Sequence, residues 1–438
     1  MTTRTFQAGI HPPAFKERTM AREVMDIAMP EELVIPLHQH TGAPCGPLVK
    51  VGDEVLAGQK IGDSKSYVSA PVHASAAGVV KAIEPRLYFT GAQVSSVVVT
   101  VAKEQKMAPL PPGKRADDAT PEDIRKAARE AGLVGMGGAA FPTAVKLSPP
   151  SDKPIDTVIV NGCECEPYLT CDHRNMLERP SEIIGGARLL MKAVGAKRCV
   201  LGIEANKSDA LGLLGDAIKD ETGMDVMALE VKYPQGAEKQ LIKAVLDREV
   251  PPGKLPMEVG ALVHNIATTI ALYQAVTQGM PLIERVLTVT GPAVANPQNV
   301  RVKVGTSVRH ILEQCGGAVN AAKVVLGGPM TGWAQSTLDV PVVKGTGGIL
   351  ALTPDLAGPD GHLACVRCGR CIKDCPMFLY PNFIGLYAEA HQWDKAESWG
   401  ALDCFECGIC AYVCPSRRPL VQFVRTAKAQ ITARRRSA

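Results

Sequence analysis

Two groups of cysteines near the carboxyl end of the sequence carry the clearest chemistry. Each group has the spacing C-x-x-C-x-x-C-x-x-x-C-P, first at Cys365, Cys368, Cys371, Cys375 and Pro376, and again at Cys404, Cys407, Cys410, Cys414 and Pro415. Two-residue spacings let a tight loop present three thiolates to one [4Fe-4S] cube, and in two-cluster ferredoxins the cysteine before the proline ligates the other cluster. The pattern therefore predicts two [4Fe-4S] clusters and one-electron transfer.

The same rule predicts which thiols share a cluster. One set is Cys365, Cys368, Cys371 and Cys414, and the other is Cys404, Cys407, Cys410 and Cys375. A pair of zinc knuckles is the alternative, but tetrahedral zinc takes four ligands in two pairs and needs no repeated set of four with a trailing proline. Between the motifs, apolar residues spaced by three and four predict one helix from Pro381 to Gly400 that separates the loops.

The composition narrows what the remaining chain can be. At about 150 residues per domain, 438 residues indicate roughly three domains. A net charge of +4 is too small for the electrostatic footprint of a nucleic-acid binder. The chain has no run of 18 apolar residues, and its first twenty residues lack the apolar segment of a signal peptide. We therefore expect a cytoplasmic chain whose 14 cysteines bind metal, react or are buried rather than form disulfides.

The middle of the sequence alternates strands and helices. Thr120-Pro121-Glu122-Asp123 predicts a helix start, and the helix should run to about Gly132. Strands are predicted at 157–160, 199–203 and 226–231, and helices at 183–194 and 208–219. This order is typical of a parallel α/β sheet, in which ligands lie beyond the carboxyl ends of the strands. Polar and glycine residues follow all three predicted strands, so a nucleotide-like ligand is expected there.

A glycine-rich segment precedes this sheet and reads Gly135-Met136-Gly137-Gly138-Ala139-Ala140-Phe141-Pro142-Thr143. Missing side chains would let the backbone approach a flat ring or a phosphate closely. The segment follows a helix rather than a strand, so it is not the dinucleotide fingerprint. From these residues alone, a plain glycine-rich turn is an equal alternative.

These motifs resemble those of a known flavoprotein. Gly135-x-Gly137-Gly138-Ala139-x-Phe141-Pro142-Thr143-x-x-Lys146 and Asn161-x-x-Glu164-x-Glu166-Pro167 are similar to the flavin and NADH motifs of the NADH-binding flavoprotein subunit of respiratory complex I. From about Thr5 to Pro419 the sequence resembles the RnfC family, the C subunits of ion-translocating ferredoxin:NAD oxidoreductase (Rnf) complexes. There are departures from the complex I pattern: Met136 replaces an arginine, Ala237 an acid and His264 an asparagine.

The resemblance implies FMN as a cofactor and NAD(H) as a substrate. The residues that it assigns to FMN are Gly135, Gly137, Gly138, Lys146, Asn161, Glu164, Gly236, Glu238 and Asn265. Phe141 and Glu166 match positions associated with the nicotinamide nucleotide. The plain alternatives are a solvated lysine, ordinary loop acids and capping asparagines. Cys163, Cys165 and Cys171 are expected to be buried or flavin-adjacent thiols rather than a metal site.

The expected fold class is multidomain α/β. The resemblance divides the chain into a barrel-sandwich hybrid (1–115), a Rossmann-like FMN/NADH-binding domain (116–280), a β-grasp SLBB domain (281–355), a helical two-[4Fe-4S] ferredoxin domain (356–420) and a basic tail (421–438). Alternating apolar residues and turn dipeptides support the barrel-sandwich hybrid. There, Lys65 lacks the flanking motif of a carrier domain, and His38, His40 and Cys45 are not expected to bind metal. Arg434, Arg435 and Arg436 are expected to lie in a solvated tail.

NADH gives up two electrons as a hydride, whereas a cluster takes one, so a flavin is needed between them. The sequence thus predicts a peripheral, cytoplasmic-face subunit of a bacterial inner-membrane Rnf complex that moves electrons between NAD(H) and ferredoxin. Expected partners are other Rnf subunits, including membrane subunits and an iron-sulfur subunit, and ferredoxin indirectly, with no nucleic acid. No catalytic acid or base is expected, because the cofactors carry the reaction. A soluble cobalamin reductase of the microcompartment type and a flavin-free electron wire are the alternatives.

Overall fold

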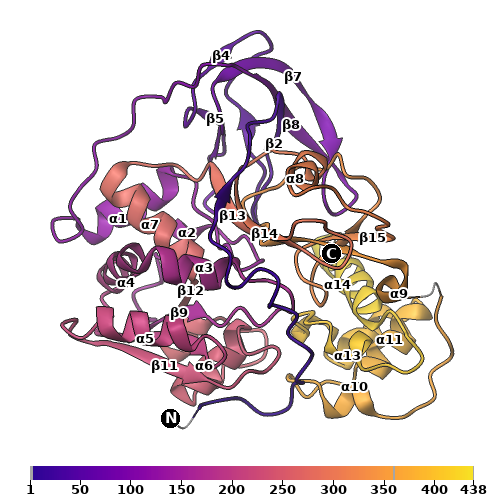
Figure 1. The fold of residues 1–438 in the computed structure, drawn as a ribbon. Coiled ribbons are helices and arrows are strands. Elements are labelled where there is room, and N and C mark those ends of the chain that lie inside the picture. The colour runs from indigo at the N-terminus through magenta and orange to yellow at the C-terminus, as the bar shows by residue number, and fades with distance from the viewer. Residues whose placement is uncertain (1–2, 359–360, 438) are drawn as a thin grey trace.

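The computed structural model describes residues 3–358 and 361–437. In Figure 1 the strands of the amino-terminal region lie at the top, a helix-covered sheet lies at the left, and the carboxyl-terminal helices lie at the lower right. The amino-terminal stretch that precedes the first strands runs between the helix-covered sheet and the carboxyl-terminal helices (Figure 1). It donates a backbone hydrogen bond from Gly9 to the carbonyl oxygen of Asp374.

The amino-terminal region is all β, as predicted. Its strands are β2 (Glu32–Pro36), β3 (Gly46–Pro47), β4 (Glu54–Val55), β5 (Lys60–Asp63), β6 (Val72–His73), β7 (Gly78–Leu87) and β8 (Gln93–Val101). One sheet has the order β2-β8-β7-β4 and the other β3-β5-β6. Leu33 and Ile35 on β2 face the same core as Val97 and Val99 on β8, because every second side chain of a strand points to the same face.

A parallel sheet in the order β11-β10-β9-β12 forms the α/β region. Its strands are β9 (Thr157–Gly162), β10 (Arg198–Glu204), β11 (Met224–Leu229) and β12 (Ala261–Asn265). Its helices are α1 (Pro121–Glu130), α2 (Thr143–Lys146), α3 (Cys171–Glu178), α4 (Pro180–Val194), α5 (Ser208–Ala217), α6 (Glu238–Leu246) and α7 (Ile266–Gln278). Helices α1, α4, α5 and α7 share one core with the sheet, and α6 packs in a second core on other strand positions.

The strand order reverses at β9, because β10 and β11 lie on one side of it and β12 on the other. Ligands of open α/β sheets bind beyond the carboxyl ends of the strands at such a switch point. The predicted alternation of strands and helices is confirmed, with the third strand starting two residues earlier than expected. Strand β12 and helices α2, α3, α6 and α7 were not predicted.

A mixed sheet in the order β1-β14-β13-β17-β15-β16 follows. Its strands are β1 (Met25–Asp26), β13 (Glu284–Thr290), β14 (Gln298–Lys303), β15 (Lys323–Leu326), β16 (Trp333–Gln335) and β17 (Gly348–Leu352), and α8 (Val308–Gln314) packs in the same core. The predicted strand, strand, helix, strand order is confirmed. Strand β1 comes from the amino-terminal stretch and pairs with β14, so the sheet is completed by a distant part of the chain.

The carboxyl-terminal region is helical. It contains α9 (Pro354–Ala357), α10 (Arg370–Lys373), α11 (Pro381–Glu389), α12 (Trp393–Ser398), α13 (Ile409–Tyr412) and α14 (Leu420–Ser437). The prediction of one helix from Pro381 to Gly400 is wrong, because His391 adopts a left-handed conformation (φ 56°) that ends α11 and lets α12 start in a new direction.

The structure also corrects the expectation of a solvated tail, because this segment is helical. Arg434 and Arg435 lie on α14 and form ion pairs with Asp394 and Glu397, while the side chain of Arg436 lies outside the described residues. Helix α14 packs on α11 and α12 through Val424, Ala427 and Ile431, which supplies the apolar contacts that a solvated tail would lack. Within residues 3–358 and 361–437, no helix combines the length and apolarity needed to cross a bilayer.

Close packing of α4 on α7 gives a test of this architecture. A Cβ atom added at Gly186 of α4 would lie 2.2 Å from the carbonyl oxygen of Thr269 on α7. We expect Gly186→Ala to destabilise the chain by about 1–3 kcal/mol, since the helices must separate. Gly212→Ala on α5, where nothing lies within 4 Å, should stabilise it by up to about 1 kcal/mol. Urea unfolding measures both, and equal effects of the two variants would contradict the packing.

Candidate functional site

Two asparagines meet at the switch point. Asn161 is the last residue but one of β9 and Asn265 is the last residue of β12, and the two are partners in the register of the parallel strands. The side-chain amide of Asn161 donates to the carbonyl oxygen of Gly236 over 2.8 Å. The side-chain oxygen of Asn265 caps α7 by accepting from the backbone N–H of Ala267. The capping alternative is therefore correct for Asn265, and both side chains also hold the site's backbone in place.

The glycine-rich loop lies beside these asparagines. It is closed by a backbone hydrogen bond from Gly135 to Phe141 over 2.9 Å. A Cβ added at Gly137 would lie 3.5 Å from the Cβ of Asn265, so the loop reaches the end of β12. At Gly138 (φ +112°), no described atom lies within 4 Å of an added Cβ. A bare backbone that faces open space at a switch point fits a flat ring or a phosphate.

Lys146 and Glu238 face each other across this edge. The Lys146 ammonium donates to Oε1 of Glu238 over 2.5 Å, and the lysine side chain is only 27% exposed. Burial lowers the pKa of nearby His264 well below its ordinary value, and the positive charge of Lys146 lowers it further. In the described part of the chain, Nε2 of His264 is buried without a hydrogen-bond partner. At this edge of the sheet, the buried Nε2 of His264 and the ammonium of Lys146 therefore lie close to the glycine-rich loop.

The two predicted loop acids are held by the protein. Glu164 accepts from the backbone N–H groups of Asp172 (2.6 Å) and His173 (3.1 Å), which satisfies the amino terminus of α3. Glu166 accepts from the backbone N–H groups of Met330 (3.1 Å) and Thr331 (2.9 Å). Burial raises the pKa of Glu166, although these donors oppose the change. Both acids therefore shape the site by tying its loop to α3 and to the 330–331 turn.

Lys16 organises the same loop and was missed from the sequence. Its ammonium is buried and donates to the carbonyl oxygens of Glu164 (2.9 Å), Glu166 (3.0 Å) and Leu169. Tyr168 donates its backbone N–H to Ala14, and its ring stacks on Phe15 with centroids 4.8 Å apart. No local motif marks Lys16, because its partners lie about 150 residues later in the chain.

Asp172 is a second residue that the motifs did not single out. Its Oδ2 accepts from the Asn265 side-chain amide over 2.6 Å. Burial raises the pKa of Asp172 to about 7, and the charge of Glu164 contributes to that rise. The only signal for Asp172 in the sequence is its position in the first turn of α3, and that helix was not predicted.

The three cysteines of this region point to different partners. The Cys163 thiol faces the carbonyl oxygen of Gly202, the Cys171 thiol faces that of Gly347, and the Cys165 sulfur accepts from the N–H of Gly236. Within the described residues, no three His, Cys, Asp or Glu side chains lie close enough to hold a single metal ion. His38 and His40 instead contact the backbone carbonyls of their own loop.

The two cysteine motifs have the same local backbone. The residue before the second cysteine is left-handed in both, at Arg367 (φ 55°) and Glu406 (φ 64°). The helices α10 and α13 each follow a left-handed glycine and each carry the third cysteine. The repeat in sequence is thus a repeat in structure, and each loop can wrap one compact object.

Thiols from the two motifs lie close to one another. Burial raises the pKa of Cys371, and the nearby thiols that raise it further are Cys414, Cys365 and Cys368. Burial also raises the pKa of Cys407 to about 12, with Cys404 and Cys375 adding to the effect. In each group, the cysteine before the proline joins the three cysteines of the other motif.

A cavity lies within the group of thiols that contains Cys407. It encloses about 360 Å³, part of it open to solvent, and its lining includes all four of Cys375, Cys404, Cys407 and Cys410. The rest of the wall is largely apolar, with Leu379, Ile384 and Val424 among its residues. A space surrounded by four thiols and apolar side chains fits a [4Fe-4S] cube.

This cysteine group adjoins the α/β region. The Tyr233 hydroxyl, three residues before Gly236, donates to the carbonyl oxygen of Cys407 over 2.6 Å. Gln240 on α6 donates to the carbonyl oxygen of Pro376 over 3.0 Å. The other group is at the surface, since Cys365 and Cys368 are exposed.

Family models match in the same order as these regions. They are the "RnfC Barrel sandwich hybrid domain" at residues 4–104, the "Nuo51 FMN-binding domain" at 128–274, the "SLBB domain" at 286–334 and the "4Fe-4S dicluster domain" at 364–418. An FMN-binding domain and a dicluster domain on one chain define an iron-sulfur flavoprotein.

Whole-chain relatives identify the family. The C subunit of the Na(+)-translocating ferredoxin:NAD(+) oxidoreductase complex of Acetobacterium woodii is 44% identical over 99% of this chain and 98% of its own length. The C subunit of the proton-translocating complex of Clostridium ljungdahlii is 41% identical over 98% and 94%, and that of the ion-translocating complex of Rhodobacter capsulatus is 39% identical over 98% and 84%. The chain belongs to the RnfC family, the C subunits of ion-translocating oxidoreductase complexes.

Solved structures share the fold. Chains of an NAD+-reducing [NiFe]-hydrogenase in its air-oxidised and H2-reduced states match with TM-scores of 0.50 and 0.51 at 21% and 20% identity. The matches cover 65% and 72% of this chain, and only 55% and 63% of the hydrogenase chains. The likeness supports the fold over the matched part of this chain.

Removal of the Lys16 ammonium tests how the loop is held. We expect Lys16→Met to lower the free energy of unfolding by about 1–3 kcal/mol or more, the cost of leaving buried carbonyl groups unsatisfied. Hydrogen exchange of the amides in residues 163–170 should accelerate. The control Lys81→Met removes an exposed lysine paired with Glu32 and should change stability by less than about 1 kcal/mol. Unchanged exchange in Lys16→Met would contradict the role of this residue.

Proposed function

We propose that this chain is the peripheral electron-transfer subunit of an ion-translocating Rnf complex, and that it moves electrons between NAD(H) and ferredoxin. The observation that carries the proposal is the contact between Tyr233 and Cys407, which joins the switch-point site to a group of four thiols. A chain with a flavin site alone or with clusters alone would lack one half of the conversion between paired and single electrons.

We propose that FMN is held at the switch point by the residues assigned from the motif: Gly135, Gly137, Gly138, Lys146, Asn161, Glu164, Gly236, Glu238 and Asn265. Bound FMN supplies chemistry that takes an electron pair from NADH and releases electrons one at a time. The bare backbone at Gly138 allows close approach, Lys146 supplies positive charge, and Asn161 and Asn265 hold the strand ends. Glu164 and Lys16 fix the neighbouring loop.

Phe141 and Glu166 remain our proposed contacts for the nicotinamide nucleotide. The N–H of Gly135 binds the carbonyl of Phe141, so the ring is carried on the closed glycine loop. Glu166 is already bonded to the 330–331 turn. We propose that it acts on NAD(H) chiefly by holding this turn at the rim of the site.

For the clusters, we propose Cys365, Cys368, Cys371 and Cys414 as the outer set and Cys404, Cys407, Cys410 and Cys375 as the inner set. Contacts of Tyr233 with Cys407 and of Gln240 with Pro376 support an inner set that lies against the α/β region. Exposure of Cys365 and Cys368 favours the outer set as the place where electrons pass to a partner. Backbone N–H groups of Glu406 and Arg418 already point to the sulfurs of Cys404 and Cys414, as donors to bound thiolates do.

The partners we propose are the other components of the complex, among them membrane subunits and an iron-sulfur subunit, with ferredoxin served indirectly. The location we propose is the cytoplasmic face of the inner membrane. The names of the full-length relatives support membership of such a complex. The matches to the RnfC barrel and to the FMN-binding domain do not support the cobalamin-reductase and flavin-free alternatives.

Anaerobic purification and NADH addition test the function. We expect bound FMN, about eight irons per chain for two cubes, and rapid loss of flavin and cluster absorbance on adding NADH. Iron without flavin, or full cofactors that do not respond to NADH, would contradict it.

Single cysteine variants test the exchange of ligands between the motifs. Cys414→Ser should disturb the same cluster as Cys365→Ser, and Cys375→Ser the same cluster as Cys404→Ser, because each pair belongs to one set. Electron paramagnetic resonance of reduced samples should therefore give two matching pairs of spectra. If Cys414→Ser instead resembled Cys404→Ser, each motif would hold its own cluster.

The Lys146 side chain gives a test of the flavin site. Lys146→Met should weaken FMN binding at least about tenfold, the effect of losing one charged hydrogen bond in a partly buried site. Titration of flavin-depleted protein with FMN measures this. Lys126→Met on α1 removes an exposed lysine and should leave binding unchanged. Equal FMN affinity in both variants would place the flavin elsewhere.

A further inference from the structure

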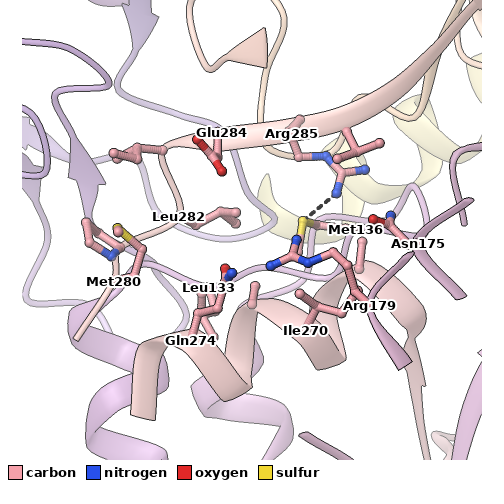
Figure 2. A pocket seen from close by; sticks show the side chains of 15 residues that line it. Leu133, Met136, Asn175, Arg179, Ile270, Gln274, Met280, Leu282, Glu284 and Arg285 are labelled. Atoms are coloured by element: carbon pink, nitrogen blue, oxygen red, sulfur yellow. Dashed lines mark hydrogen bonds between the residues drawn. The ribbon is translucent and has the colours of Figure 1, made fainter. Parts of the chain in front are cut away.

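A cavity lies behind the glycine-rich loop, between α7 and β13 (Figure 2). It encloses about 520 Å³, part of it open to solvent. Met136 of the loop forms one wall, Ile270 and Gln274 of α7 another, and Glu284 and Arg285 of β13 a third. Its lining includes none of the residues proposed to hold FMN or iron, so it is separate from the sites already described.

Arg285 is the unusual group in this cavity. The residue is 3% exposed, its Nε donates to the carbonyl oxygen of Thr346 over 3.2 Å, and its Nη1 lies 2.6 Å from the Met136 sulfur (Figure 2). Nη2 has no hydrogen-bond partner among the residues that the structure describes. A thioether is only a weak acceptor. A buried guanidinium is costly unless an anion and good acceptors face it.

The acidic groups around the cavity are already engaged. Glu284 accepts from Lys303 over 2.9 Å, and Glu182 accepts hydrogen bonds from both Nε and Nη2 of Arg179. Asp172 lies near Arg285 on the side of the flavin site and offsets part of its charge, although it forms no direct ion pair with it and accepts from the amide of Asn265. Within residues 3–358 and 361–437, Arg285 forms no ion pair within 4.0 Å, so no carboxylate is bonded directly to its guanidinium.

Two further donors surround Arg285. Asn175 is 2% exposed and lines the cavity, and its side-chain amide makes no hydrogen bond to any described residue. Arg179 also lines the cavity, and its guanidinium lies beside Met136 in Figure 2. Its Nη1 is not used in the pair with Glu182. The cavity therefore combines one cation without a directly bonded carboxylate, one paired cation and a buried amide.

We propose that this cavity binds a small oxyanion, of the size of inorganic phosphate or a short carboxylate, with Arg285, Asn175 and Arg179 as its ligands. The planar guanidinium fork suits two oxygens of one phosphate or carboxylate group. The buried amide of Asn175 donates to a third oxygen. Apolar neighbours such as Ile270 and Leu282 exclude water, which strengthens charged hydrogen bonds.

Isothermal titration of the purified full chain with inorganic phosphate, at constant ionic strength, tests the proposal. We expect one saturable site and an apparent Kd at least about tenfold higher in Arg285→Met, since charged hydrogen bonds are lost. The apparent Kd of Arg285→Lys should fall between those of the parent and of Arg285→Met, because lysine keeps the positive charge but lacks the planar guanidinium that binds two oxygens. The control Arg309→Met removes an exposed arginine paired with Asp339 and should bind as the parent does.

Asn175→Leu provides a second variant if Arg285→Met does not fold, and it should weaken phosphate binding without removing charge. Acetate and succinate compete with phosphate if the site takes carboxylates, and only phosphate analogues compete if it is selective for phosphate. Parent-like phosphate binding in both variants would overturn the proposal. So would displacement of phosphate by NAD+ in the parent chain, since the anion would then occupy the nucleotide site.

Discussion

The hydrogen bond from the Tyr233 hydroxyl to the carbonyl oxygen of Cys407 joins the two chemical regions of this chain. Tyr233 is buried and lies three residues before Gly236, the residue whose carbonyl accepts from Asn161. One short segment thus contacts the end of β9 on one side and an iron-binding loop on the other. Gly408 shows the same closeness, since a Cβ added there would lie 2.3 Å from the carbonyl oxygen of Met330. These contacts fix how near the inner cysteine set lies to the switch point.

Distant parts of the chain stabilise this arrangement. The amino-terminal stretch inserts Lys16 beneath the 164–169 loop and extends the β13 sheet through β1. Glu166 binds the turn at Met330, and that same turn touches Gly408 of the inner cysteine loop. Sequence-distant segments therefore converge on one small volume, and the geometry of electron transfer depends on tertiary packing as much as on the motifs.

The sequence predicted what is encoded locally, such as the two cysteine motifs, the helix start at Thr120 and the parallel alternation. Strand β12 was missed because it is followed directly by α7, with no turn between Asn265 and Ile266, inside one largely apolar stretch from 259 to 276. The roles of Lys16, Tyr233 and Arg285 depend on partners far away in the chain, so no local pattern marks them. The motif assigned Glu164 and Glu166 to ligands, and it could not show that both carboxylates also accept hydrogen bonds from backbone N–H groups.

The most direct test of the account is rapid freeze-quench electron paramagnetic resonance after mixing NADH with two variants. One carries Cys375→Ser with Cys404→Ser, and the other carries Cys365→Ser with Cys368→Ser. If the inner set lies between the flavin site and the outer set, the first variant should keep an intact outer cluster that NADH does not reduce on the millisecond scale. The second should still show prompt reduction of its inner cluster. Prompt reduction of the outer cluster in the first variant would contradict the account.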